Sequence, residues 1–166
     1  MTHYETVVKK ARKKDLDGIL ALQAENQMDR GGSLSASLPR ARLKMMLADM
    51  PIIVARHGDR VTGFLMATSR EMNADLPIVK AMFDAYQGTP DAYVYGPICV
   101  GAQERGKGLA QRMFDKLRAL EPGREGVLFI RSDNAASIRA HEKMNMEKVA
   151  DFQFNDFQYA VFSYFG

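Results

Sequence analysis

The stretch Y-G-P-I-C-V-G-A-Q-E-R-G-K-G-L-A-Q-R-M-F-D-K-L-R, residues 95–118, decides the fold of this chain. Its apolar run at 98–100 predicts a buried strand, and apolar residues spaced three and four apart from Leu109 to Leu120 predict a helix. Between them, R-G-K-G-L-A at 105–110 places glycines where the helix starts. Free N–H groups and the helix dipole attract an anion at such a position. The stretch therefore predicts a binding site for a phosphate or pyrophosphate.

The composition is that of an ordinary folded protein. The chain has 166 residues, 46% hydrophobic and 26% charged, so we expect one domain, 1–166, with a sizeable core. Its one cysteine, Cys99, excludes an internal disulfide and is typical of a reducing compartment. No apolar run reaches the roughly 18 residues of a membrane helix, and the first residues lack the pattern of a secretory signal. We therefore expect a cytoplasmic protein with no membrane partner.

The net charge is +3, which is a modest excess. The basic residues are scattered, with small clusters at 9–14 and 40–44, and they form no dense stripe interleaved with aromatic residues. A nucleic acid is therefore not expected as the main partner, because an anionic cofactor accounts for the same excess.

Periodicity and turn residues predict the order β-α-α-β-β-α-β-α-β-α-β-β for the whole chain. Asp15 is expected to cap the first helix, Pro39 to begin the second, and Gly58-Asp59 to join two strands in a hairpin. The expected fold class is α/β (α+β), with a mixed central sheet of about seven strands and helices on both faces. The expected strands are 6–12, 51–57, 60–69, 92–100, 126–131, 147–152 and 157–164. Besides the helix that begins at Pro39, the expected helices are 15–27, 77–86, 109–120 and 134–144.

A second motif, N-A-A-S-I-R-A-H-E-K-M-N-M-E-K-V, occupies 134–149. Together with R-G-K-G-L-A it resembles the two motifs of the GNAT (GCN5-related) superfamily of N-acetyltransferases, and the order of elements agrees over almost the whole chain. The resemblance implies the GNAT acyl-CoA N-acyltransferase fold and direct acetyl transfer from acetyl-CoA to an amine, without a metal. The chain departs from the family pattern twice, with His141 where a tyrosine is common and Asn145-Met146 where Gly-Phe is common.

The resemblance also implies how acetyl-CoA is bound. Backbone N–H groups of the first motif would hold the pyrophosphate, and the pantetheine arm would lie along the preceding strand, where Tyr95-Gly96-Pro97 disturbs the ladder. Asn134 either contacts this arm or caps its own helix, with Ser137 in the first turn. A backbone N–H near Cys99 or Val100 would polarise the thioester carbonyl, and the Cys99 side chain is expected to be a core residue rather than an acylated nucleophile. The implied cofactor-binding residues are Ile98, Cys99, Val100, Arg105, Gly106, Lys107, Gly108, Leu109, Ala110, Asn134 and Ser137.

Proton transfer has several candidate residues. His141 occupies the position of the family's acid, although its place on an apolar helix face also fits an ordinary buried side chain. Tyr95 is a substitute acid, as are Tyr93 and Tyr159. Glu71 is a candidate base, together with Asp75, and each of these carboxylates also fits a solvated loop charge.

The acceptor amine is not identified by the sequence. Met28 to Leu38 and Glu71 to Tyr86 are expected to determine it, and small-molecule and peptide amines both remain open. A non-catalytic acyl-CoA sensor on the same fold is the alternative function, motivated by His141. An unrelated nucleotide binder is disfavoured, because no Gly-Lys-Ser/Thr or strand-Gly-x-Gly-x-x-Gly pattern occurs. The terminal hairpin, with F-Q-Y-A-V-F-S-Y-F at 157–165, either presents a sheet edge that could pair with a second copy of the chain or is buried within one chain, so a homodimer remains possible.

Overall fold

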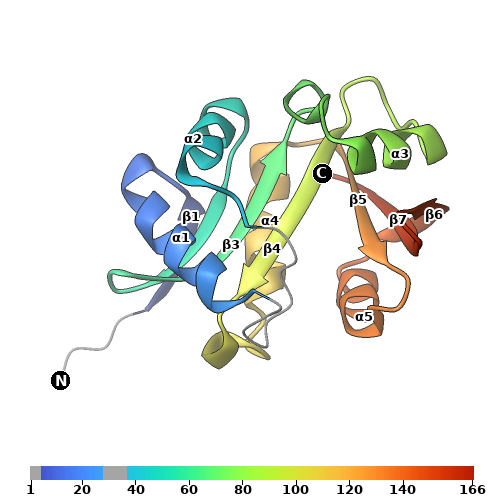
Figure 1. Cartoon of the computed structure of the whole chain (residues 1–166). Coiled ribbons are helices and arrows are strands. Elements are labelled where there is room, and N and C mark those ends of the chain that lie inside the picture. Colours follow the sequence, from blue (N-terminus) through green and yellow to red (C-terminus); the bar gives the residue numbers. More distant parts are fainter. Residues whose placement is uncertain (1–4, 28–36) are drawn as a thin grey trace. The chain divides into compact units, whose positions relative to one another are not determined.

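The strands form a mixed seven-stranded sheet in the order β1-β2-β3-β4-β5-β7-β6 (Figure 1). This computed structural model describes residues 5–27 and 37–166, and within those ranges five α-helices accompany the sheet. The elements are β1 (Thr6–Lys10), η1 (Lys13–Asp15), α1 (Leu16–Glu25), α2 (Arg40–Asp49), β2 (Ile53–His57), β3 (Arg60–Thr68), η3 (Glu71–Asn73), α3 (Pro77–Ala85), β4 (Tyr93–Val100), η4 (Ala102–Glu104), α4 (Leu109–Leu120), β5 (Glu125–Arg131), α5 (Ala135–Lys143), β6 (Glu147–Phe154) and β7 (Phe157–Phe165). The predicted fold class and order of strands and helices are confirmed.

The N-terminus of α1 differs from the prediction. Asp15 ends the short 3-10 helix η1 and occupies the expected N-cap position of α1, but its side chain makes no capping hydrogen bond to that helix. Its carboxylate instead accepts a hydrogen bond from the backbone N–H of Arg12 at 2.8 Å and pairs with Arg56 at 3.2 Å. The carboxylate is buried, and the cation compensates for the loss of hydration.

The strand pairs explain the mixed sheet. β1, β2 and β3 pair antiparallel, β4 pairs parallel with β5, and β5, β7 and β6 pair antiparallel. β7 lies between β5 and β6, so of the two possibilities for the segment 157–165, an exposed edge or burial within the sheet of one chain, the structure shows burial. The apolar run of β5 pairs with β7 along its whole length, from Glu125 with Phe165 to Arg131 with Tyr159. The edge strand at that end of the sheet is β6.

The chain divides into two compact units, each made of two segments: Met1–Ala67 with Gly96–Leu120, and Thr68–Tyr95 with Glu121–Gly166. In the first unit, α4 packs on β1 and β2, and α1 packs against α2. Figure 1 shows α1 and α2 in front of the strands of this unit and α4 behind them. This arrangement explains why every residue of β3 after Arg60 is buried.

A β-bulge in β3 lets one strand contact helices on both sides. Ala55 pairs with Gly63 and Arg56 with Val61, so Thr62 is an extra residue in the ladder. A side chain at Gly18 of α1 would touch Val61, and one at Gly63 would touch Met113 and Leu109 of α4. Residues two apart normally share a face of a strand, and the bulge breaks that alternation.

The second unit has its own core between α3 and the sheet. Val79 and Met82 of α3 pack with Val94, Val127 and Val161 of three strands.

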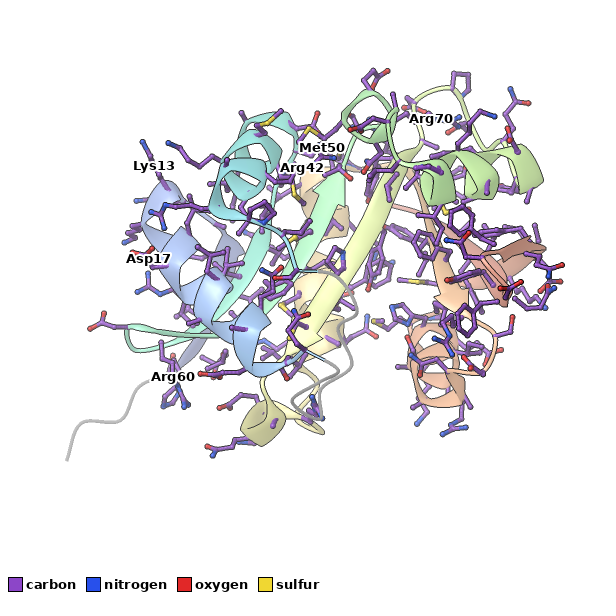
Figure 2. The ribbon with its side chains drawn as sticks, viewed as in Figure 1. Lys13, Asp17, Arg42, Met50, Arg60 and Arg70 are labelled. Atoms are coloured by element: carbon purple, nitrogen blue, oxygen red, sulfur yellow. The ribbon has the colours of Figure 1, made fainter. Side chains whose placement is uncertain are left out.

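Two side chains, the half-buried Arg70 and the buried Glu125, fix the segment that joins α3 to β4. Arg70 donates to the carbonyls of Gln87 and Thr89 and lies over the ring of Phe83, beside α3 in Figure 2.

Glu125 holds the same segment from β5. Its buried carboxylate accepts hydrogen bonds from Tyr86 Oη at 2.7 Å, from the N–H of Thr89 at 2.7 Å and from Ser163 Oγ. Burial opposes ionisation of Glu125, but these hydrogen bonds together lower its pKa below the usual value. The segment between α3 and β4 is therefore anchored by side chains that lie outside it.

Candidate functional site

The start of α4 is an open, glycine-rich turn in the first unit. Gly106 and Gly108 adopt positive φ angles of 77° and 76°, in the left-handed region that favours glycine. Both are exposed, and an added Cβ at either would meet nothing within 4 Å. The carbonyl of Gly108 accepts from the N–H of Arg112 at 3.1 Å, which is the first helical hydrogen bond. By helix geometry, the N–H groups of the first turn have no carbonyl partner within the helix.

Side chains of this turn make contacts within the same unit. Glu104 pairs with Arg60 at 3.1 Å and with Lys107 at 3.7 Å. Arg105 directs its guanidinium to Asn26 of α1. The positive charge available at the turn therefore comes from backbone dipoles and from Arg105, whose hydrogen-bond acceptors are neutral, whereas the charge of Lys107 is partly offset by Glu104.

The strand before the turn contains Ile98, Cys99 and Val100, of which Cys99 is buried. Burial raises the pKa of the Cys99 thiol to about 11, although the charge of Arg105 opposes this. A thiol with this pKa is protonated near neutral pH and is a poor nucleophile. Its surroundings agree with the expected role as a small core residue.

The parallel ladder between β4 and β5 is short. Tyr93 pairs with Gly126 and Val94 with Val127, and the register ends there. The peptide bond Gly96-Pro97 that follows is cis, and Gly96 has φ 105°. The Tyr95-Gly96-Pro97 sequence thus comes directly after the last ladder pair, where a disturbance was predicted.

His141 and Tyr95 lie together in the second unit. Tyr95 Oη is 3.1 Å from His141 Nε2, and the two rings meet edge to face at 5.5 Å. His141 Nδ1 is 2.7 Å from the carbonyl oxygen of Ser137, one turn earlier in α5. Since a carbonyl oxygen can only accept, Nδ1 carries the proton and donates it. In the neutral imidazole, Nε2 is then an acceptor and receives the hydroxyl proton of Tyr95.

Burial determines the charge of this pair. Both side chains are only 5% exposed. Burial lowers the pKa of His141, although its hydrogen bond to Ser137 opposes the change, and burial raises the pKa of Tyr95. Near neutral pH the pair therefore consists of a neutral imidazole and a protonated phenol, in which the histidine is the proton acceptor.

Two further tyrosines extend this buried cluster. Tyr164 of β7 packs edge to face against Tyr95 at 5.8 Å, and its hydroxyl lies 2.5 Å from that of Tyr93. Tyr93 was a predicted candidate, whereas Tyr164 was not predicted. The only sequence signal for Tyr164 is its place in the alternating terminal strand. Tyr159, the third substitute acid, instead stacks on Phe152 at 5.1 Å.

The other candidates occupy distinct places. Asn134 Oδ1 accepts from the N–H of Ser137 at 3.2 Å, so the helix-capping role is present. Glu71 begins η3 as an exposed carboxylate, in the manner of a solvated loop charge. Residues 28–36 of the predicted acceptor segment lie outside the described residues. Leu38, at the end of that segment, exchanges two backbone hydrogen bonds with the side chain of Gln23, at 2.9 and 3.0 Å.

Two further features bear on ligands and partners. Across 5–27 and 37–166, no three His, Cys, Asp or Glu side chains lie in positions to hold a metal ion. None of the helices in those ranges combines the length and apolar character required to cross a membrane.

Comparison with known proteins gives a consistent family match. The model of the acetyltransferase (GNAT) family matches residues 19–146. The chain is similar to an N-acetyltransferase from Staphylococcus aureus Mu50, with 21% identity, TM-score 0.69, and 97% of this chain and 98% of that one covered. A GNAT-family acetyltransferase from Streptococcus agalactiae 2603 has 13% identity, TM-score 0.74 and coverage of 100% and 98%. NAA60 of Arabidopsis thaliana, in complex with acetyl-CoA, has 16% identity, TM-score 0.72 and coverage of 97% and 99%.

Among curated proteins, no significant sequence match to the chain is found. The similar structures share less than 25% sequence identity with the chain, so they establish its fold alone. The assignment to a family rests instead on the match of the family model to residues 19–146.

Proposed function

Because the chain belongs to the GNAT family of acetyltransferases, we propose that it is an N-acetyltransferase moving the acetyl group of acetyl-CoA directly to a primary amine. The observation that carries the proposal is the turn directly before α4, where Gly106 and Gly108 are exposed, have positive φ angles, and would bring an added Cβ within 4 Å of nothing. This is the arrangement that binds phosphate groups at helix N-termini.

The residues present fit the cofactor that the family uses. Backbone groups from Arg105 to Ala110 would hold the pyrophosphate, and Lys107, which is exposed, adds a cation. Backbone groups of Ile98, Cys99 and Val100 would align the pantetheine arm, with Asn134 and Ser137 as further contacts. Acetyl-CoA supplies an activated acetyl thioester when it is bound.

We assign proton transfer to the pair formed by Tyr95 and His141. An incoming ammonium must lose a proton, and neutral His141 Nε2 is the basic atom in the pair. In the proposed relay, Tyr95 Oη gives its proton to Nε2 as it takes the proton released by the ammonium, so that the phenol is regenerated and His141 becomes an imidazolium. Glu71 remains an alternative base at an exposed position.

The acceptor is proposed to be a primary amine of a small molecule or peptide. The sheet and helices provide a fixed scaffold, and the segment from η3 through α3 is a candidate for selecting the acceptor. We further propose a single catalytic domain acting in the cytoplasm, with neither a nucleic acid nor a membrane as its partner. A homodimer is a further possibility, and because β7 is paired on both sides, edge pairing at this end of the sheet would use β6.

Calorimetry with acetyl-CoA, desulfo-CoA and NAD tests the cofactor, and an acetylation screen over a diverse amine library tests the reaction. We expect both CoA forms to bind and NAD not to bind, together with acetylation of at least one amine class. Absence of binding below millimolar concentrations for both CoA forms would refute the proposal.

A non-catalytic acyl-CoA sensor is the second candidate, favoured by the burial of His141 and its contact with Tyr95. This function predicts that His141→Phe binds acetyl-CoA like the wild type, while the wild type acetylates nothing in the amine library. Detection of a turnover product by mass spectrometry would exclude it.

A further inference from the structure

The turn that leads into α4 is held to the rest of its unit at three points. The N–H of Gly101 donates to the carbonyl of Thr62 at 2.8 Å, and Glu104 pairs with Arg60 at the start of β3, labelled in Figure 2. The third attachment is from Arg105 to Asn26, 79 residues away in sequence, at the C-terminal end of α1. It is the attachment that the motif alone does not predict.

Asn26 is built to receive the guanidinium. Its side chain is buried, with 4% of the residue exposed, and Nδ2 donates to the carbonyl of Leu22 at 2.9 Å. Oδ1 lies 3.2 Å from Nη2 of Arg105. The orientation of the amide is fixed, because a carbonyl only accepts and a guanidinium only donates. The hydrogen bond to Leu22 also satisfies a carbonyl in the last turn of α1, which has no helical partner there.

Arg105 connects both ends of the turn. While Nη2 reaches Asn26, Nε donates to the carbonyl of Val100, the last residue of β4, at 3.4 Å. The guanidinium therefore closes the path from 100 to 105, directly before Gly106. Glycines at positive φ have many accessible conformations, so the residue before them strongly influences where their N–H groups point.

We propose that Asn26 and Arg105 form a positioning pair that holds the turn 101–108 in the conformation that binds the pyrophosphate of CoA. The inference rests on the proposed function, because that function supplies the ligand. The pair acts by preorganisation, which reduces the ordering needed on binding. It contributes to cofactor affinity and takes no part in acetyl transfer itself.

The test compares Asn26→Leu, Arg105→Met and the double variant with the wild type. Calorimetry with CoA gives the dissociation constant, initial rates with an acceptor from the amine screen give kcat and KM, and hydrogen exchange of peptides covering 101–110 reports on the free protein. We expect each single variant to weaken CoA binding by roughly three- to tenfold, the effect of losing one charged, partly exposed hydrogen bond. KM for acetyl-CoA should rise in parallel while kcat changes by less than about twofold, and the turn should exchange faster.

The double variant should bind CoA no more weakly than whichever single variant has the lower CoA affinity, because both substitutions remove the same contact between Asn26 and Arg105. Arg105→Lys, which keeps a donor for Asn26, should restore part of the affinity. Arg40→Met is the matched control, since it removes another arginine that contacts α1, through Asp17, outside the turn. It should leave CoA binding and exchange of the turn unchanged.

Unchanged CoA affinity and unchanged exchange in Asn26→Leu, with the wild type binding CoA normally, would overturn this inference alone. A wild type that binds no CoA would overturn the proposed function and with it the affinity argument made here. The two failures are thus distinguished by the wild-type titration.

Discussion

The hydrogen bond from Tyr95 to His141 limits the charge states that the two side chains can adopt. A protonated imidazole would donate from both nitrogens, so Tyr95 could no longer donate to it without turning its hydroxyl. Burial adds a desolvation cost for that charge. The native pair is therefore stable as a neutral unit and sensitive to acid.

The first prediction concerns stability against pH. The pKa of His141 is lowered on folding, so the unfolded state takes up a proton at a higher pH than the native state does. The stability from neutral His141 is therefore present above about pH 6.5 and is lost as pH falls towards the folded pKa. Urea unfolding of the wild type and of His141→Gln at pH 7.5 and 5.5 measures this. The loss should be smaller in the variant, and equal losses would contradict the assignment.

The second prediction concerns turnover. If neutral His141 accepts a proton, kcat should fall at low pH, below the lowered pKa of His141, and His141→Gln should remove that dependence. Tyr95→Phe and His141→Gln should each lower kcat by about a hundredfold. Binding of CoA by calorimetry should change little in folded variants. A low-pH limb that persists in His141→Gln would show that another group titrates.

The third prediction concerns Cys99. Because burial raises its thiol pKa to about 11, the thiol should react slowly with Ellman's reagent at pH 7.5 in the native protein and rapidly in guanidinium chloride. Intact mass after incubation with acetyl-CoA should show no acetylated Cys99. An acetyl group located on this residue by peptide mapping would establish a covalent intermediate.

For individual residues, the sequence allows the prediction of side-chain contacts between residues that are close together in the chain. The cap from Asn134 to Ser137 spans three residues and follows from local preferences. The contact between Tyr95 and His141 spans 46 residues and depends on how β4 and α5 meet, so each residue was a candidate separately and the pair was not predicted. Arg105 was assigned to the cofactor, because nothing local reveals its bond to Asn26.

Among the secondary-structure elements, β5 and β7 show how one small residue fits a large neighbour. Gly126 lies opposite Tyr164 in the antiparallel pair, and a Cβ at Gly126 would come within 2.4–2.6 Å of the tyrosine ring. That ring cannot easily move, because its hydroxyl is bound to that of Tyr93 and the ring packs edge to face with Tyr95. The glycine is therefore required by packing.

The fourth prediction follows from this fit. Gly126→Ala should destabilise the protein by about 3 kcal/mol, the upper range for overpacking in a tight core. Gly123→Ala is the control, because Gly123 has φ 72° but an added Cβ there meets nothing within 4 Å. It should cost only about 1 kcal/mol of backbone strain. Urea unfolding of both variants gives the comparison, and a smaller cost for Gly126→Ala than for Gly123→Ala would contradict it.

The periodic signals that define the helices and strands are local, which explains why their order could be predicted. The bulge at Thr62 could not, because V-T-G-F-L-M-A-T is apolar on both faces and contains no alternation to interrupt. For Asp15, the N-cap position was predicted correctly but the side-chain contacts were not. Its carboxylate accepts from the N–H of Arg12 and pairs with the partly buried Arg56 instead of capping α1.

For the whole molecule, the order of strands in the sheet is the feature that could not be predicted from the sequence. The terminal hairpin was predicted correctly as two strands, but the sequence left undecided whether 157–165 is exposed at the sheet edge or buried, and the structure places β7 inside the sheet and β6 at its edge. Both strands carry aromatic residues, and only the full-length pairing of β5 with β7 decides between them. Such pairing depends on contacts distant in sequence.

The fifth prediction uses the stability of the whole chain as a readout of binding. A ligand that binds only the native state at 100 times its dissociation constant adds about 2.7 kcal/mol. For a chain of this length, that should raise Tm by roughly 5–10 °C. Differential scanning fluorimetry should show the rise with acetyl-CoA and none with NAD. An equal rise with NAD would indicate a different ligand class.

The anchoring of the segment between α3 and β4 has a consequence for how such a protein can change. Arg70, which lies before α3, and Glu125, which begins β5, both bind the segment 86–92 through the backbone of Thr89. Exposed positions between 71 and 85 can therefore change without loss of the attachment, provided that Val79 and Met82 stay apolar in the core and Phe83 keeps a ring beneath Arg70. If this segment selects the acceptor, as we propose, chimaeras that keep these residues together with Arg70 and Glu125 should exchange acceptor preference between acetyltransferases.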